Sequence, residues 1–407
     1  MADEVLRKQL LDELKIVNGL EAEGVNFAPS IFNEYFSEHP EDALFHYCMD
    51  NSYEDTTKFH VPAEIRVGHG FGSQVQTNFK SPYKLIKEGS EFFVTKNEEV
   101  LAPFSISKAW VSYGKKTSDG VKFGSFLTTG NLKYGEGVAF VAYSDECALL
   151  QRGKDCLFCN INATKRRFGD LEQHQWKYPK QIGEAVKQAF ADGADHFNIT
   201  GGFVPERREL EYYIDVAEAI QEATGREDFN GTAVIGAPED LKVLEQYKEA
   251  GYRTIAIHPE VWGENWFNAI CPGKAEVGGG FNHYLDAVDA ALEIFGKGKV
   301  RTQFVAGLQP KNELYDGLEY FAERGVVALS LAWIPNIGSA LEGQRSPTEE
   351  WHWEVVNKNY EILRKNGITY DVLYDSLPNR RVLGDLFRIN DHIDKGTPLF
   401  EDKRVQK

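Results

Sequence analysis

Hydrophobic and polar positions divide the chain into two parts with different patterns. From about residue 137 onward, short apolar runs alternate with longer segments whose apolar residues recur every three or four positions. Such runs are typical of strands buried on both faces, and the longer spacing is typical of helices. We expect strands at 138–143, 196–200, 232–235, 253–257, 300–306, 326–334 and 370–374, and helices at 179–191, 209–223, 238–250, 284–295, 313–323 and 348–365. Repeated alternation predicts a parallel sheet with right-handed crossovers, closed partly or fully into a (β/α) barrel.

The first part of the chain is irregular by comparison. Residues 2–20 have the pattern of an amphipathic helix, and short β-prone runs at Phe92–Val94 and Trp110–Tyr113 lie between turn-forming residues. The sequence therefore predicts an α/β protein in three segments. An α+β, β-rich extension covers 1–130, the barrel covers 131–375, and a C-terminal extension covers 376–407.

Composition narrows the classes of function. Of 407 residues, 42% are hydrophobic and 26% are charged, which is typical of a globular protein and excludes disordered and fibrous chains. The 45 Lys and Arg against 62 Asp and Glu give a net charge of −17, so we expect neither a nucleic-acid partner nor a membrane partner. The chain has no apolar run of a membrane span's length and no signal-peptide core, and it has an odd number of cysteines, five. We therefore expect a cytoplasmic location.

Three of the cysteines lie on the polar loop after the first barrel strand. Cys147, Cys156 and Cys159 have the spacing C-x8-C-x2-C, which suits thiolates that share one metal centre. An iron–sulfur cluster held by three thiolates leaves one iron open to an external ligand. A zinc site needs a fourth ligand, for which His174 is a candidate. A third alternative is that these are ordinary buried cysteines.

Further motifs follow in a recognisable order. Phe158 lies between the last two cysteines, Thr200–Gly202 closes the second strand, Val305–Leu308 ends the fifth, and Ala332–Leu341 follows the sixth. Together these segments resemble the radical S-adenosylmethionine (radical SAM) superfamily, nearest to its biotin synthase and hydrogenase maturase branch. The sequence departs from the family pattern in two places. The first cysteine gap is eight residues rather than three, and Phe203 stands where an acidic residue is usual.

The resemblance implies a site and a reaction. The three cysteines would bind a 4Fe–4S cluster, and S-adenosyl-L-methionine would lie against Phe158, Thr200, Gly201, Gly202 and Ile334. The enzyme would reductively cleave S-adenosylmethionine to a 5′-deoxyadenosyl radical, which takes a hydrogen atom from a small-molecule or cofactor-precursor substrate in cofactor or natural-product biosynthesis. An electron donor such as flavodoxin or ferredoxin would be its partner. The alternative is a non-catalytic iron–sulfur or zinc-binding barrel that acts through a partner protein.

Polar residues on strands four and five are the next candidates. His258 and Glu260 alternate at the end of strand four, where they either bind the ribose hydroxyls or form a polar rim. Arg301 and Gln303 alternate on strand five. A buried Arg301 needs a partner, which is either the S-adenosylmethionine carboxylate or a salt bridge to Glu260 or another barrel carboxylate.

The segment 261–282 is expected to be a long loop over the barrel mouth. It contains Cys271, which either donates a hydrogen atom in catalysis or is buried and inert. It also contains Lys274, which could pair with an anionic substrate but which we expect to be solvated. The glycines at 278–280 suit a hinge better than a phosphate loop. We interpret Cys48 as a core residue.

Overall fold

The computed structural model of this chain describes residues 2–40, 43–44, 61–62, 64–107, 115–123, 138–143, 147–159, 161, 177–336, 338–376 and 382–392. The predictions that concern Cys48, His174 and residues 110–113 lie outside these ranges.

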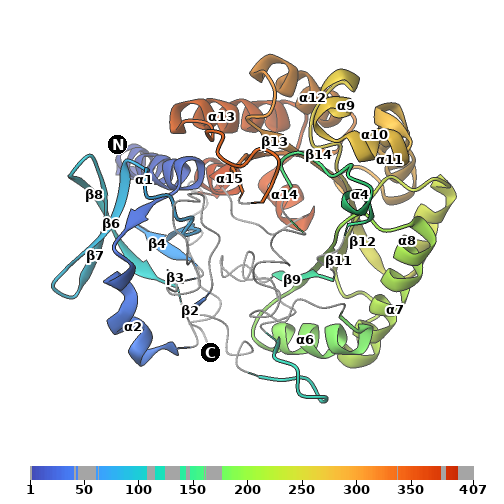
Figure 1. The fold of residues 1–407 in the computed structure, drawn as a ribbon, viewed down its shortest axis with the longest axis horizontal. Helices are drawn as coiled ribbons and strands as arrows, with labels where there is room; N and C mark the ends of the chain where they lie inside the picture. The colour runs from blue at the N-terminus through green and yellow to red at the C-terminus, as the bar shows by residue number, and fades with distance from the viewer. Residues whose placement is uncertain are drawn as a thin grey trace.

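A parallel sheet of six described strands forms the larger part of the fold (Figure 1). Its strands lie side by side in the order in which they occur in the chain, and every pair is parallel. This order winds the chain in one direction and places the helices on one face, so the sheet is a curled half-barrel, as the sequence predicted. The strands are β9 (Val138–Ala142), β10 (His196–Thr200), β11 (Gly231–Ile235), β12 (Tyr252–Ile257), β13 (Val300–Ala306) and β14 (Val327–Ala332).

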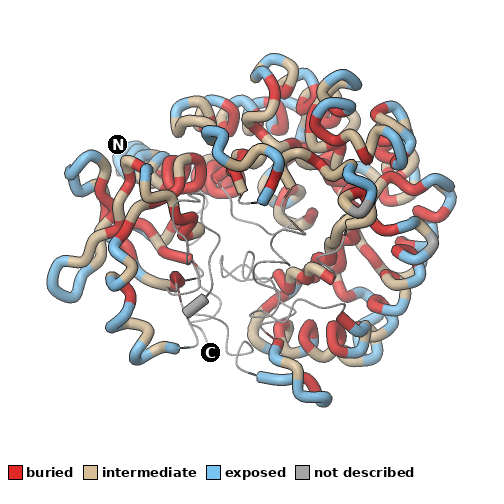
Figure 2. The backbone as a smooth tube through the Cα atoms, in the orientation of Figure 1, coloured by how far each residue is buried: buried red, intermediate tan, exposed pale blue. Residues whose placement is uncertain are grey.

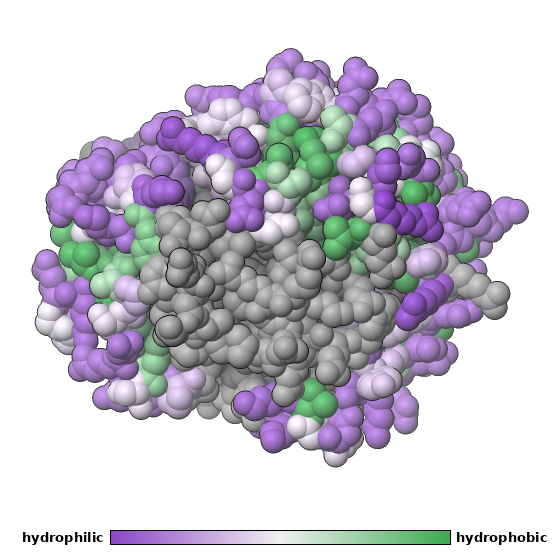
Figure 3. All heavy atoms as spheres, in the orientation of Figure 1, coloured by the Kyte–Doolittle hydropathy of each residue, from purple (hydrophilic) through white to green (hydrophobic). Residues whose placement is uncertain are grey.

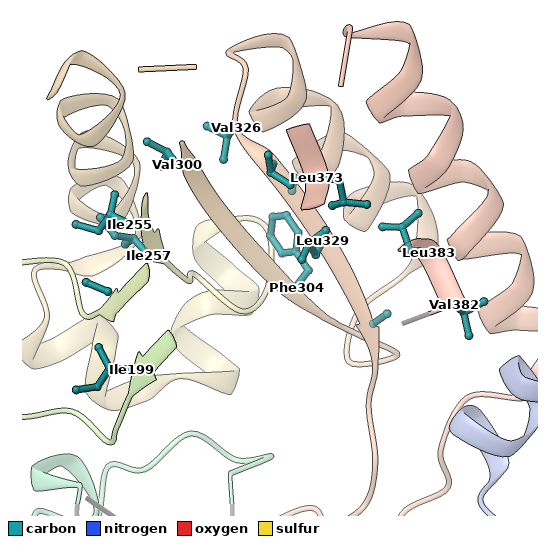
Figure 4. Close-up of a cluster of buried hydrophobic side chains, with 14 of the residues drawn as sticks. Ile199, Ile255, Ile257, Val300, Phe304, Val326, Leu329, Leu373, Val382 and Leu383 are labelled. Carbon is teal, nitrogen blue, oxygen red and sulfur yellow. The ribbon is translucent and has the colours of Figure 1, made fainter. Parts of the chain in front are cut away.

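Helices cover the outer face of this sheet (Figure 1). They are α6 (Pro179–Ala191), α7 (Glu206–Thr224), α8 (Leu244–Glu249), α11 (Gly280–Phe295), α12 (Lys311–Glu323) and α13 (Glu349–Lys365). The short helix α4 (Ala148–Gln151) follows β9 in the chain, and α9 (Glu264–Ile270) and α10 (Pro272–Val277) follow β12. Aromatic and branched side chains of alternate strand residues pack against the outer helices, and the ring of Phe304 lies 5.9 Å from that of Phe321 on α12. Figure 4 shows part of this core, with Ile199, Ile255 and Ile257 on the strands. The other strand residues therefore face the interior of the half-barrel.

Two predicted elements differ from the structure. Residues 238–250 form a 3-10 turn (Leu241–Val243) followed by α8, because Asp240 accepts a hydrogen bond from the backbone N–H of Lys242 and starts the helical segment later than expected. The expected loop at 261–282 contains the short helices α9 and α10 instead. Pro272 stands at the start of α10, where its missing N–H costs no hydrogen bond.

The predicted strand at 370–374 is wrong, since residues Tyr370–Ser376 form helix α14. Leu373 is buried there, and Figure 4 shows it in the core with Leu383 of helix α15 (Val382–His392). The end of α14 meets the amino ends of the parallel strands. Thr232 Oγ1 donates to the carbonyl of Ser376 at 3.3 Å, and Asp375 pairs with Lys299 and, at 3.5 Å, with Arg253. Helix α14 thus closes the end of the sheet opposite the cysteine loop.

The N-terminal part contains a second six-stranded sheet in the order β1-β6-β7-β8-β4-β5. The strands β2 and β3, which lie between β1 and β4 in the sequence, form a separate antiparallel pair. The elements of the N-terminal part are α1 (Ala2–Glu23), β1 (Asn26–Phe27), a 3-10 turn (Pro29–Phe32), α2 (Asn33–Glu38), β2 (Ala43–Leu44), β3 (Val61–Pro62), β4 (Ile65–Val67), β5 (Phe71–Ser73), β6 (Tyr83–Glu88), β7 (Glu91–Lys96) and β8 (Glu99–Ile106). The expected α+β, β-rich character is confirmed.

Helix α1 joins this part to the barrel. Asn18 Nδ2 donates to the carbonyl of Glu349 at 2.9 Å, and its Oδ1 lies 2.8 Å from Nδ1 of the buried His352 on α13. The domain boundaries at 130 and 376 remain predictions.

Buried positions concentrate on the strands and on the inner sides of the helices (Figure 2). Hydrophilic side chains dominate the described surface in the view of Figure 3, in keeping with the high content of charged residues. In the part of the chain that the structure describes, no helix has the length and apolar character of a membrane span.

Candidate active site at the carboxyl ends of the parallel strands

The loop that carries the three cysteines follows β9 and is fastened to three neighbouring segments. The N–H of Ala148 donates to the carbonyl of Phe203 after β10, at 2.9 Å. The N–H of Leu157 donates to the carbonyl of Ile270 at the end of α9, also at 2.9 Å. The carbonyl of Leu157 accepts from the N–H of Leu341 after β14, at 3.2 Å. The loop is therefore held where the carboxyl ends of the strands converge.

The three thiols lie in one electrostatic neighbourhood. Cys156 is buried, while Cys147 and Cys159 are half-buried. The N–H of Cys159 donates to the carbonyl of Cys156 at 3.0 Å, which closes the turn between them. Burial, with smaller contributions from the nearby Cys156 and Cys147, raises the pKa of Cys159 to about 12. The Cys159 thiol is therefore hard to ionise unless a cation binds it.

A thiol set of this kind suits an iron–sulfur cluster, since thiolates hold such clusters and Cys159 gains from a bound cation. Among the described residues, no group of three or more His, Cys, Asp or Glu side chains is arranged to hold a metal ion. The metal-ligand role of Cys147, Cys156 and Cys159 therefore remains a prediction that rests on residue type, loop position and mutual electrostatics.

Cys271 lies against this loop. It is fully buried at the junction of α9 and α10, and its thiol is hydrogen-bonded to that of Cys156. That bond lowers the pKa of Cys156, whereas burial and the bond together raise the pKa of Cys271 well above its usual value. Burial agrees with the interpretation of Cys271 as an inert thiol, but the contact with a predicted cluster ligand is a feature that the sequence pattern did not indicate. The catalytic role of Cys271 remains untested.

Gly201 has a steric reason to be glycine. A Cβ atom added there would lie 2.3 Å from Cε1 of the buried Tyr143, far inside van der Waals contact. The carbonyl of Thr200 accepts from the N–H of Tyr143 at 2.9 Å, so the ring and the turn are packed as one unit. The Gly201–Gly202 turn thus lies beside the start of the cysteine loop, as the motif order predicted.

A buried ion pair organises the end of β12. Lys274 Nζ donates to Oε1 of Glu260 at 2.7 Å and to the carbonyl of His258 at 2.8 Å. Both charged side chains are only 15% exposed, and Tyr284 covers the ammonium at 5.5 Å from its ring centre. The expectation that Lys274 is solvated is therefore wrong. The insertion of α9 and α10 carries Lys274 back onto the strand end and pairs it with Glu260.

Arg301 lies inside the half-barrel with a nearly bare guanidinium. It is 3% exposed, and its Nη2 donates to Oδ1 of Asn198 on β10 at 3.2 Å. Its Nε and Nη1 are buried and have no hydrogen-bond partner. The structure shows no salt bridge from Arg301 to Glu260, the expected alternative, and Glu260 pairs with Lys274 instead. Among the described residues, Arg301 has no ion-pair partner.

The remaining predicted site residues lie around the same end of the sheet. Thr200 ends β10, Gln303 is half-buried on the inner face of β13, Ile334 follows β14, and Phe158 packs at the edge of the core beside the cysteines. Sequence patterns missed Asn198, whose position within a short apolar-flanked strand carries no signal of its contact with Arg301.

No family model matches the chain. The curated bacteriochlorophyllide c C-7(1)-hydroxylase of Chlorobaculum limnaeum is 29% identical over 250 residues, which cover 57% of this chain and 61% of the relative. Methylornithine synthase has 15% identity and a TM-score of 0.43, over 59% of this chain and 68% of that one. Coproporphyrinogen III oxidase from Escherichia coli, described as a radical SAM enzyme, has 14% identity and a TM-score of 0.38, over 57% of this chain and 54% of that one.

The similar solved structures include proteins described as radical SAM enzymes, the superfamily that the sequence resembles. The chain spans about three fifths of the curated relative's length, so the activity, substrate and partners of the whole protein are matters of proposal.

Proposed function

We propose that this protein is a radical SAM enzyme that acts on a small-molecule or cofactor-precursor substrate. The observation that carries the proposal is the cysteine loop. It places three thiols after β9 and is hydrogen-bonded to the segments that follow β10, α9 and β14. In parallel α/β sheets the active site lies at this carboxyl end of the strands.

The residues present would divide the work as follows. Cys147, Cys156 and Cys159 would hold a 4Fe–4S cluster. When bound, the cluster and S-adenosylmethionine supply a 5′-deoxyadenosyl radical by one-electron cleavage of the sulfonium, and the radical takes a hydrogen atom from the substrate. The Gly201–Gly202 turn and the Glu260–Lys274 pair form the polar wall on which S-adenosylmethionine would lie.

The proposal includes S-adenosylmethionine contacts for Phe158, Thr200, His258, Gln303 and Ile334. It also includes a flavodoxin or ferredoxin as electron donor and a cytoplasmic location. Biosynthesis of a cofactor or natural product is the setting that we propose. A non-catalytic carrier is a poorer fit, because it has no use for a buried, nearly unpaired guanidinium and a buried ion pair inside the half-barrel.

Iron content tests the cluster. Protein purified without oxygen and reconstituted with iron and sulfide should hold about four irons per chain, as three-cysteine 4Fe–4S sites do. We expect the triple variant Cys147→Ala, Cys156→Ala, Cys159→Ala to lose this iron. Cys48→Ala, outside the motif, is the matched control and should retain it. Full iron retention in the triple variant would refute the cluster assignment. Wild-type protein that holds zinc instead of iron would support the zinc-binding alternative.

A further inference from the structure

Arg301 is a buried cation whose hydrogen-bonding capacity is mostly unused. One of its three nitrogens bonds to a neutral amide, and the other two have no partner. Asn198, which receives that bond, is fully buried, and its own Nδ2 also lacks a partner. An unpaired buried charge is costly, so a position of this kind is expected to serve a ligand that neutralises it.

The groups around Arg301 do not supply the missing negative charge. His196 on β10 and His258 after β12 are its titratable neighbours. Burial, followed by the positive charge of Arg301, lowers the pKa of each. Both imidazoles are therefore neutral near pH 7. His196 is satisfied at Nε2, which lies 2.7 Å from Oγ1 of Thr232. Burial lowers the pKa of Arg301 only to about 10, so it stays charged.

The unpartnered side-chain atoms of Arg301 and Asn198 are all donors. Arg301 Nε and Nη1 and Asn198 Nδ2 offer N–H groups with no acceptor among the described residues. A planar carboxylate suits this set, because its two oxygens accept two parallel N–H bonds from a guanidinium and have lone pairs left for an amide. A neutral alcohol or an amine would leave the charge uncompensated.

The depth of Arg301 in the sheet distinguishes two possible carboxylates. The Gly201–Gly202 turn and Ile334 follow the last residues of their strands, where the resemblance places S-adenosylmethionine. Arg301 aligns across the sheet with Ala256, one residue before the end of β12, and its guanidinium reaches Asn198 on β10. Its partner Asn198 lies two residues, about 7 Å, below the end of β10. The layer of Gln303 lies between Arg301 and the strand ends.

We propose that Arg301 and Asn198 bind a carboxylate of the substrate, on the inner face of the half-barrel below the layer that contacts S-adenosylmethionine. The inference rests on the proposed function and adds a substrate class to it, an organic acid. It replaces the expectation that Arg301 binds the carboxylate of S-adenosylmethionine.

Two variants separate these ligands. Arg301→Gln removes the charge and retains polarity. Asn198→Asp leaves Arg301 in place but sets a carboxylate where Oδ1 now accepts from Nη2 at 3.2 Å, so the guanidinium is neutralised internally. Asn198→Asp should raise the unfolding temperature of the ligand-free protein, because it pairs a buried charge. A lower unfolding temperature for Asn198→Asp would contradict the unpaired cation.

Binding is then measured on reconstituted, oxygen-free protein. Calorimetry should give S-adenosylmethionine affinities within about twofold of one another for wild type and both variants. In S-adenosylmethionine-loaded wild type, acetate and butyrate should raise the unfolding temperature, and acetamide and butyramide should not. Both variants should lose the response to the acids.

Four results would overturn the inference itself. A loss of S-adenosylmethionine affinity of roughly 10- to 150-fold in Arg301→Gln, the size of a charged hydrogen bond, would assign Arg301 to that cofactor's carboxylate. Equal responses to acids and amides in wild type, or an acid response retained in Arg301→Gln, would show that no such site exists. Wild type that binds no S-adenosylmethionine refutes the proposed function itself. Wild type that binds S-adenosylmethionine but not the acids refutes this inference alone.

Discussion

Replacing Lys274 with methionine should destabilise the protein far more than a typical lysine substitution does. The ammonium bonds to Glu260 at 2.7 Å and to the His258 carbonyl at 2.8 Å. Burial disfavours its charge, but Glu260 together with Tyr284, Cys156 and Cys271 outweighs burial and raises the pKa of Lys274 well above its usual value. Removing one partner of a fully buried pair costs about 3–5 kcal/mol. Because the Lys274 and Glu260 side chains are each 15% exposed, we expect Lys274→Met to lower the free energy of unfolding by about 3 kcal/mol.

A double-mutant cycle in urea measures the pair itself. Lys274→Met leaves Glu260 unpaired, and Glu260→Gln leaves Lys274 unpaired, whereas the double variant leaves neither charge. The double variant should therefore be more stable than the sum of the single losses implies, by at least about 1.5 kcal/mol. The pair Lys154–Glu276, at 3.2 Å between the cysteine loop and α10 but 43% and 60% exposed, is the matched control. Its coupling should stay under about 1 kcal/mol. A coupling near zero for Lys274 and Glu260 would refute the buried-pair geometry.

Two further predictions concern the packing behind the Gly201 turn. Burial raises the pKa of Glu209 to about 8 from 4.5, so the folded protein retains a proton that the unfolded chain releases, and stability should fall as pH rises from 4.5 to 8. In Glu209→Gln this loss of stability with pH should be smaller by up to about 4 kcal/mol. The urea midpoints of the variant and of wild type should therefore diverge as pH rises, and parallel pH profiles would contradict the prediction. Gly201→Ala places a Cβ 2.3 Å from the Tyr143 ring and should lower stability by about 1–3 kcal/mol. The further substitution Tyr143→Leu should lower stability less in the Gly201→Ala variant than it does in wild type. Additive costs in the urea measurements would show that the ring and the turn do not clash.

Much of the barrel could be predicted because its sequence signal is local. The apolar runs at 138–142 and 196–200 are too short for helices and correspond to β9 and β10. Residues 370–376 misled the same reasoning, because Tyr370, Leu373 and Tyr374 suit one face of a helix as well as a short strand. Packing against the sheet end decides between the two, and a seven-residue pattern does not contain that information.

The polar site could be predicted by residue but not by partner. The sequence predicts both Glu260 and Arg301 inside the barrel, yet the partner of each depends on the path of α9 and α10. That path brings Lys274 to Glu260 and leaves Arg301 with Asn198. Strand alternation specifies which way a side chain points, whereas the identity of its partner is a long-range property of the fold. The contact of Cys271 with Cys156 is of the same kind, since 115 residues separate them in the sequence.

Formation of 5′-deoxyadenosine tests the central claim most directly. Reconstituted wild type, reduced with dithionite and supplied with S-adenosylmethionine, should release 5′-deoxyadenosine and methionine, measured by chromatography. Cys48→Ala should do the same, and the triple variant of Cys147, Cys156 and Cys159 should release none. If wild type holds an intact, reducible cluster and forms no more 5′-deoxyadenosine than the triple variant, the assignment of this protein as a radical SAM enzyme is wrong.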